Sequence, residues 1–355
     1  MKVLYDYQGF MQRHGGVSRY FVELTAAMKS LEGFEAVIPP FFTDNEYLPK
    51  KRTFLTPRPF KGKVRVMSAL NRVISRRSLG SAYDLFHPTY FHPYFLSRLK
   101  SPFVITVHDM IHHLYSGNYV RDDGTQLNMR VLCEKASRII AVSQTTKEDL
   151  CRLLEIPDSK VAVIHHGTNL SYREEERVHA DRYLLYVGER DGYKNFRFFL
   201  SSTAPFLKTE GVDLVCVGFR PFAGAEKALI SRLGVGARVR HIRVTTAGEL
   251  ASLYHFASAF CYPSLHEGFG MPLLEAFSCG CPVVASAIPS FQEVAADAAE
   301  CFDPKDSSSL RSSVEKVVLD SKRSQDLVRR GHTRVKMFSW ERAAKATLEV
   351  YQTAV

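Results

Sequence analysis

Two glutamates eight residues apart are the side chains best placed to do chemistry in this sequence. Glu267 lies in a glycine-containing loop, and Glu275 lies in the helix expected to follow it. Pro272 suits the first position of that helix and Gly280 suits its end. The helix start leaves backbone N–H groups without acceptors and carries the positive end of the dipole. Such carboxylates and amides can bind sugar hydroxyls and anionic oxygens. A turn followed by a helix with two solvated glutamates would give the same sequence pattern.

The elements around this loop predict an α/β fold. Apolar strands alternate with helical segments, which is typical of parallel sheets, and the polar stretch 167–181 interrupts the series as a linker. We therefore expect two doubly wound, Rossmann-like domains facing a central cleft, with ligands at the carboxyl ends of the strands. The expected strands are 2–5, 35–38, 103–107, 139–142 and 161–164 before the linker, and 183–187, 213–217, 239–244, 259–262 and 282–285 after it.

The net charge of +10 belongs to one segment. The chain of 355 residues has 47 Lys and Arg against 37 Asp and Glu, and residues 50–80 hold ten basic side chains and no acidic one. The remainder is therefore neutral. An anionic membrane, an acidic glycan or a nucleic acid would suit this segment, and so would a solvated basic loop. Its basic residues are Lys50, Lys51, Arg52, Arg58, Lys61, Lys63, Arg65, Arg72, Arg76 and Arg77.

Composition narrows the class of protein. With 45% hydrophobic and 24% charged residues the chain is typical of a globular protein. There is no apolar run of about 20 residues, and the start of the sequence does not follow a signal-peptide pattern. Seven scattered cysteines suggest neither a disulfide framework nor a zinc site. We expect a cytoplasmic protein, with peripheral contact at the inner face of the cytoplasmic membrane through residues 50–77 as a further hypothesis.

Several motifs, in order along nearly all of the chain, resemble those of the retaining glycosyltransferases of family 4, which have the GT-B architecture. The spacing of Glu267 and Glu275 matches that family's E-x7-E signature. The resemblance implies an N-terminal acceptor-binding domain (1–168), a C-terminal nucleotide-sugar-binding domain (169–337) and a closing helix (338–355) that crosses back to the first domain. Further matching segments are 15–20, 104–109, 136–143, 163–169, 186–195, 280–286, 291–294 and 338–341.

The resemblance also implies roles for individual residues. Glu275 is expected to bind the donor ribose, Glu267 to lie near the transferred sugar, and Lys194 to pair with the diphosphate. The expected catalytic residues are His108, Glu267 and Lys194. The expected donor-binding residues are Gly15, Gly16, Arg190, Lys194, Arg243, Val244, Glu267, Gly268, Phe269, Gly270, Met271 and Glu275.

Two departures from the family pattern affect these roles. Glu189 stands where family members often carry an arginine, so Arg190 is the candidate for a second phosphate cation. Residues 241–246 lack the usual glycine followed by an aromatic residue, and Arg243 and Val244 fill the place that reads the base. The base is therefore open, with a weak preference for GDP-mannose. His108, with Asp109, His112 and His113, superficially resembles a metal cluster, but a histidine directly after a strand is expected in a loop.

The predicted function is transfer of a hexose from a nucleotide-diphosphate sugar to a lipid-linked or growing bacterial surface polysaccharide, as in lipopolysaccharide synthesis. The resemblance implies retention at the anomeric carbon, and we expect neither a metal nor a cofactor because no D-x-D triplet is present. Phosphate-loop, dinucleotide and esterase motifs are also missing. The alternatives are a GT-B nucleotide-sugar epimerase, a glycan phosphorylase, an inactive glycan-binding relative and a basic nucleic-acid-binding protein, which lacks a supporting motif.

Overall fold

The computed structural model describes residues 1–355 apart from 14, 49–52, 55–59, 116–123, 175 and 180. Four of the basic residues named above, Lys50, Lys51, Arg52 and Arg58, lie outside the described residues. The chain forms two compact units. Unit 1 comprises Met1–Ser116, Arg121–His166 and Trp340–Val355, and unit 2 contains Gly167–Ser339.

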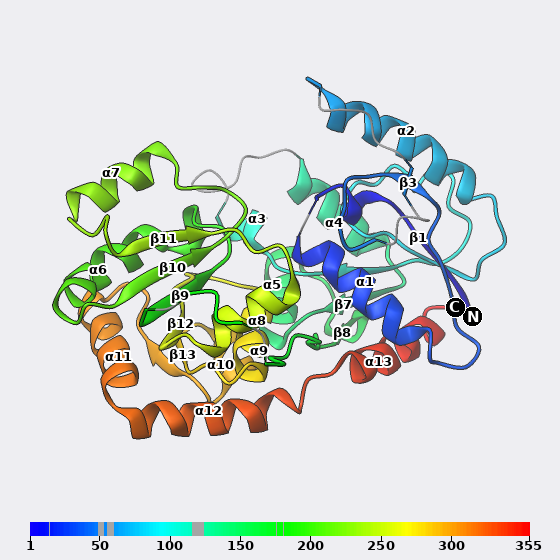
Figure 1. The fold of residues 1–355 in the computed structure, drawn as a ribbon. Coiled ribbons are helices and arrows are strands. Elements are labelled where there is room, and N and C mark those ends of the chain that lie inside the picture. The colour runs from blue at the N-terminus through cyan, green and yellow to red at the C-terminus, as the bar shows by residue number, and fades with distance from the viewer. Residues whose placement is uncertain (14, 49–52, 55–59, 116–123, 175, 180) are drawn as a thin grey trace. The chain divides into compact units, whose positions relative to one another are not determined.

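Unit 1 is built on parallel strands (Figure 1). One sheet has the order β2-β1-β5 and another the order β6-β7-β8, and a single parallel bridge between Phe86 and Phe103 connects them. β1 leads through a helix to β2 on one side, whereas β5 lies on its other side. The strand order therefore reverses between β1 and β5. The strands are β1 (Lys2–Tyr5), β2 (Glu35–Val37), β5 (Leu85–His87), β6 (Val104–Val107), β7 (Arg138–Ala141) and β8 (Val161–Val163).

Helices from both ends of the chain cover this sheet. Tyr20, Phe21 and Leu24 of α1 are buried in the same core as Trp340 and Tyr351 of α13. The Tyr351 hydroxyl also lies 2.9 Å from that of Tyr5. The helices are α1 (Gly16–Met28), α2 (Lys63–Ser78), α3 (Ile111–Leu114), α4 (Thr125–Lys135), α5 (Gln144–Leu154) and α13 (Trp340–Gln352), with short elements η1 (Gln8–Phe10), β3 (Phe41–Phe42), β4 (Thr53–Phe54) and η3 (Asp158–Lys160).

Unit 2 contains a six-stranded sheet in the order β11-β10-β9-β12-β13-β14, and all of its pairings are parallel. β9 leads to β10 and β11 on one side and β12 lies on its other side, so the order reverses between β9 and β12. The strands are β9 (Tyr183–Val187), β10 (Asp213–Val217), β11 (Val239–Ile242), β12 (Ala259–Tyr262), β13 (Val283–Ser286) and β14 (Glu300–Phe302).

Helices alternate with these strands, as a doubly wound fold requires. Phe199 and Leu200 of α6 and Leu310 and Val314 of α11 are buried against the sheet. The helices are η4 (Gly192–Lys194), α6 (Phe196–Thr209), α7 (Gly224–Arg232), α8 (Ala247–His255), α9 (Met271–Ser278), α10 (Pro289–Ala295), α11 (Ser307–Leu319) and α12 (Ser321–Val335). In the described part of the chain, none of the helices combines the length and the apolar character that a membrane crossing needs.

Some elements differ from the sequence-based expectation. The segment 63–78 is a helix, α2, and its buried residues Met67, Asn71 and Ser75 include two polar side chains. The Phe42 N–H donates to Asn71 Oδ1 at 2.9 Å, and Asn71 Nδ2 donates to the Phe42 carbonyl at 2.8 Å. Polar contacts therefore contribute to the packing of this helix in addition to its apolar side chains. The strand expected over 239–244 ends at Ile242.

Candidate functional site

Two of the predicted donor residues of unit 2, Lys194 and Glu267, lie together where the strand order reverses. In doubly wound sheets this reversal opens a crevice outside the carboxyl ends of the strands. The loop after β9 carries Lys194 and the loop after β12 carries Glu267. The Leu265 N–H donates to the Tyr193 carbonyl at 2.8 Å, which holds the two loops together.

Lys194 and Glu267 form an ion pair in this crevice. Lys194 Nζ lies 2.6 Å from Glu267 Oε1, and the Ser264 hydroxyl donates to the same oxygen at 2.7 Å. Burial alone would lower the pKa of Lys194, but the charge of Glu267 and the neighbouring Tyr262 and Tyr193 raise that pKa well above its usual value. Lys194 is therefore a persistent cation.

The glycine loop leads directly into α9. Gly270 precedes the helix with φ at +106°, and a Cβ there would lie 3.0 Å from the Phe291 ring. Glycine is therefore needed for both conformation and space. Phe269 is buried, and its ring centroid lies 5.9 Å from that of Phe338. Met271 begins α9 and Pro272 occupies its first turn, so Gly268–Met271 present backbone at a helix start, as expected from the sequence.

Glu275 lies on α9, in the interior of unit 2. Its side chain is buried, and its Oε2 accepts a hydrogen bond from the Tyr254 hydroxyl at 3.0 Å. Tyr254 belongs to α8, so this bond fixes the carboxylate between two helices. Burial and the Glu275 charge raise the pKa of Tyr254 well above its ordinary value, which keeps the phenol a donor.

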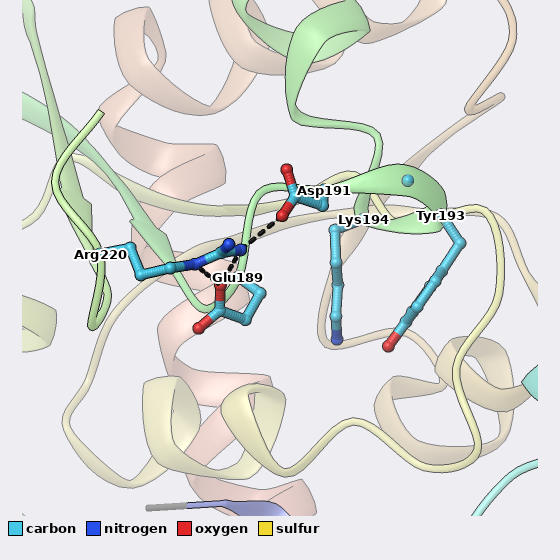
Figure 2. A pocket seen from close by; sticks show the side chains of 6 residues that line it. Glu189, Asp191, Tyr193, Lys194 and Arg220 are labelled. Carbon is cyan, nitrogen blue, oxygen red and sulfur yellow. Dashed lines mark hydrogen bonds and ion pairs between the residues drawn. The ribbon is translucent and has the colours of Figure 1, made fainter. Parts of the chain in front are cut away.

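A pocket of about 300 Å³ opens beside Lys194 (Figure 2). Figure 2 shows the Lys194 and Tyr193 side chains extending in the same direction, next to an ion-paired group on the other side of the pocket. Arg220 is the centre of that group, 2.8 Å from Glu189 and also paired with Asp191. Sequence reasoning missed Arg220; its place three residues after β10, beside β9, is the signal that could have revealed it. The lining residues are Glu189, Asp191, Gly192, Tyr193, Lys194 and Arg220.

Arg190 has other partners than the phosphate expected for it. The side chain is buried, and its Nε donates to Glu226 at 2.6 Å. Its Nη2 donates to the carbonyls of Arg220 and Pro221 at 2.6 and 3.2 Å. The guanidinium therefore supports the loop after β10 and does not line the pocket.

The two residues assigned to base recognition follow β11. Arg243 is exposed and Val244 is half-buried in the connection to α8. Neither lines the pocket beside Lys194.

The other predicted residues belong to unit 1. Gly15 is the N-cap residue of α1 and Gly16 is its first residue, and no side-chain cap is present among the residues that the structure describes there. His108 directly follows β6, and its Nε2 is buried without a hydrogen-bond partner among the described residues. Burial lowers the pKa of His108 to about 4, so the ring is neutral at pH 7. The ring lies edge-on to Tyr20 at 4.9 Å.

The histidines near residue 110 do not converge on a metal-binding arrangement within the described ranges. Among the described residues, one group of three possible metal ligands lies close together. Its members are His179, Asp181 and Asp213, whose ligand atoms are all within 4.8 Å of one another. Asp213 is buried and paired with His179 and Arg238, each at 3.3 Å. The Asp213 carboxylate therefore already has side-chain partners, and none of the three residues lines the Lys194 pocket.

Comparison with known proteins identifies this fold and site. The model of the family described as Glycosyltransferase Family 4 matches residues 14–172, and that of Glycosyl transferases group 1 matches residues 170–334. The two matches together cover most of the chain, so it belongs to the group 1, family 4 type of glycosyltransferases, as the motifs predicted.

Curated relatives include two O-antigen enzymes. The O-antigen chain mannosyltransferase RfbU of Salmonella typhimurium is 27% identical over 215 residues, which is 60% of each chain. The O-antigen chain mannosyltransferase B of Escherichia coli is 28% identical over 235 residues, 62% of this chain and 61% of the relative. The chain thus spans about three fifths of the length of these two relatives.

Solved structures confirm the predicted GT-B fold. The sucrose-phosphate synthase of Thermosynechococcus elongatus aligns with a TM-score of 0.77 at 21% identity, over 99% of this chain and 98% of that one. Anabaena Alr3699/HepE in complex with UDP-glucose aligns with a TM-score of 0.76 at 18% identity, over 99% and 100% of the two chains.

Proposed function

We propose that this protein transfers a hexose from a nucleotide-diphosphate sugar to a hydroxyl group of a lipid-linked or growing surface polysaccharide. The observation that carries this proposal is the Lys194–Glu267 pair at the reversal of the unit 2 sheet. The names of the relatives add support, since two of them are O-antigen mannosyltransferases. They also favour GDP-mannose as donor, whereas the HepE structure contains UDP-glucose.

The donor residues divide by chemistry. Lys194 is a compact cation that suits a diphosphate, and Arg220 is the nearest arginine of the same pocket. The backbone of Gly268–Met271, at the start of α9, suits anionic oxygens. Glu275 suits the ribose hydroxyls and Glu267 the transferred sugar. Arg190 supports the loop that carries Arg220.

The reaction proceeds with retention in this proposal. The bond between the anomeric carbon and the diphosphate breaks with its electron pair on the phosphate oxygen, and the acceptor oxygen attacks from the same face. The departing phosphate takes the acceptor's proton. Lys194 and the α9 amides stabilise the charge that develops on the leaving group. His108, neutral at pH 7, is assigned to a hydrogen bond with the transferred sugar.

A screen of donors followed by a transfer assay tests the proposal. Thermal shifts with UDP-, GDP-, ADP- and dTDP-sugars identify the base, and we expect stabilisation by GDP-mannose. Product is then measured with and without a glycan acceptor. Sugar conversion without acceptor would indicate an epimerase, and phosphate-dependent release of sugar from a glycan would indicate a phosphorylase. Failure of every nucleotide sugar to bind would refute the transferase proposal.

We further propose that α2 rests on an anionic membrane surface. In the described chain, five of the twelve exposed large apolar side chains lie between Phe60 and Val73. Val66, Leu70 and Val73 are spaced four and three residues apart, so they form one stripe, and each is between 45 and 49% exposed. Arg65 and Arg77 are exposed on the same helix, which lies at the margin of its unit (Figure 1). An apolar stripe flanked by cations is typical of an interfacial helix.

Liposome binding tests this contact. Replacing both Arg65 and Arg77 with Ser removes about 1 kcal/mol of attraction per charge, and we expect at least tenfold weaker binding to vesicles containing anionic lipid. The pair Leu70→Ser and Val73→Ser should weaken it similarly. Leu127→Ser removes a leucine of α4 that is more exposed than Leu70, 67% against 45%, and is the matched control. If neither double variant changes the binding to anionic vesicles, α2 is a solvated helix and the proposed membrane contact is refuted.

A further inference from the structure

Unit 1 has its own strand-order reversal, between β1 and β5, and polar side chains gather there. Asp6 directly follows β1, and Thr89 and His92 follow β5. Arg72 and Arg76 reach the same place from α2, one helical turn apart. Crevices at such reversals are where doubly wound sheets bind ligands.

The carboxylate of this group is already used. Asp6 is buried, and its Oδ1 accepts from the Thr89 hydroxyl at 2.6 Å and amide at 2.8 Å and from the Gln8 amide at 3.3 Å. Its Oδ2 accepts from Gln8 Nε2 at 2.7 Å and from the Tyr94 hydroxyl at 3.1 Å. Asp6 therefore joins the loops after β1 and β5 and forms no ion pair with the arginines.

Within the described ranges, Arg72 and Arg76 consequently have no carboxylate partner. Both side chains are partly buried, and the Nε of each is buried without a hydrogen-bond partner among the described residues. Residues 49–80, which include the whole of α2, contain no acidic side chain. An arginine cannot lose its proton to relieve this cost, so two adjacent guanidinium groups whose partners include no carboxylate among the described residues indicate an anion that completes the group.

His92 adds a second indication. Its Nδ1 lies 3.1 Å from the Tyr94 amide nitrogen and its Nε2 lies 3.1 Å from Arg72 Nη2. A neutral imidazole has only one acceptor nitrogen, so one of these N–H donors has no acceptor. The group thus has donors in excess. His92 is exposed, so the excess faces a site that solvent and ligands can reach.

We propose that Arg72, Arg76 and His92 bind a phosphoryl group of the acceptor. Guanidinium groups bind phosphate through two parallel N–H bonds, and the imidazole supplies a third donor. The identification of the ligand as an acceptor rests on the proposed function, whereas the anion site itself rests on the unpaired donors. The acceptor is therefore a prenyl diphosphate or a phosphorylated glycan, and both present the same chemistry.

Calorimetric titration of inorganic pyrophosphate into the full-length chain tests the site. The Lys194→Gln background is used because the unit 2 pocket could also bind pyrophosphate. We expect Arg72→Gln with Arg76→Gln to weaken binding at least tenfold. Arg65→Gln with Arg77→Gln removes the same charge from the same helix and should change the affinity less than twofold. Equal affinities of the two double variants, whether both weakened or both unchanged, would overturn the proposal.

Further arms separate the sources of the phosphate and the two proposals. Farnesyl diphosphate represents the prenyl diphosphates and glycerol 3-phosphate represents the phosphorylated glycans. The compound that binds more tightly than the other, with an affinity that depends on Arg72 and Arg76, identifies the acceptor class. If only the binding of glucuronate depends on Arg72 and Arg76, the site binds a carboxylate and not a phosphoryl group, and the assignment is overturned. The titration contains no nucleotide sugar, so it tests the anion site independently of sugar transfer. If the protein binds pyrophosphate but shows no transfer activity in the separate assay, only the transferase proposal is refuted. If the glutamine variant does not fold, Arg72→Lys with Arg76→Lys keeps the charge and should show a smaller loss.

Discussion

At the scale of single residues, the Lys194–Glu267 pair shows how a carboxylate can serve a site that binds anions. Glu267 holds the ammonium at 2.6 Å and raises the pKa of Lys194, so the cation persists although it is largely enclosed. Because a raised lysine pKa favours the charged form, the pair stabilises the fold fully below about pH 10.4. That contribution is lost only as the pH rises through the still higher value of the folded protein.

Lys194→Gln tests the leaving-group role. Loss of one preorganised charge commonly costs 10²–10³ in kcat, or about 3–4 kcal/mol. We expect this loss in steady-state transfer assays, with an unchanged far-ultraviolet circular dichroism spectrum. Lys227→Gln, on the exposed side of α7, is the control and should retain activity. Activity of Lys194→Gln close to the wild-type value would remove Lys194 from the mechanism.

The site's motif residues could be placed from the sequence, but their partners could not. Glu267 in the loop and Glu275 on the helix are arranged as the glycines and Pro272 predicted. The bonds from Arg190 to Glu226 and from Arg220 to Glu189 join separate loops, and no spacing along the chain encodes them. That the Nε atoms of Arg72 and Arg76 have no partner among the described residues is likewise visible only once the side chains around them are known.

At the scale of elements, strands with continuous apolar runs were predicted well. β1, β9, β10 and β12 have the expected bounds because they are buried on both faces. β5 was missed because it is only three residues long and ends in a buried histidine. Ser143 caps α5, because its side chain accepts a hydrogen bond from the Thr146 amide.

Gly270→Ala tests the geometry at the start of α9. At φ +106° and with the Phe291 ring 3.0 Å from the new Cβ, the substitution should cost about 1–3 kcal/mol of stability. Urea unfolding measures this loss, and donor binding should weaken in parallel. Gly224→Ala, where a Cβ meets nothing within 4 Å, is the matched control and should change stability by less than about 0.5 kcal/mol. If Gly270→Ala is as stable as the unmodified protein, the loop before α9 accommodates the added Cβ and the geometric argument is contradicted.

At the scale of the whole molecule, acid acts on unit 1 through two buried histidines. Unit 1 contains His87 and His108, and burial lowers their pKa to about 3 and about 4 respectively. A histidine with a lowered pKa favours the neutral form in the folded state. Its contribution is therefore complete above about pH 6.5 and is lost as the pH falls toward the folded-state value.

Unit 1 should accordingly lose stability between pH 6.5 and pH 4. Each of the two histidines accounts for about 2–3 kcal/mol by pH 4.5. Trp340, the single tryptophan of the chain, is buried in the unit 1 core, so its fluorescence reports unfolding of that unit. His108→Asn should flatten the pH dependence, since it removes a group without a hydrogen bond at Nε2. An unchanged slope would show that His108 does not titrate in this range.

The position of α13 has a consequence for synthesis on the ribosome. Trp340 and Tyr351 complete the core of unit 1, whereas the described residues of unit 2 lie together between 167 and 339. Domains usually fold in the order in which they emerge, the N-terminal one first. Here unit 2 has all its parts while unit 1 still lacks a helix, so the nascent chain completes its second unit before its first. The apolar surface of α1 that packs in one core with Trp340 and Tyr351 therefore stays uncovered until residues 340–352 have been synthesised.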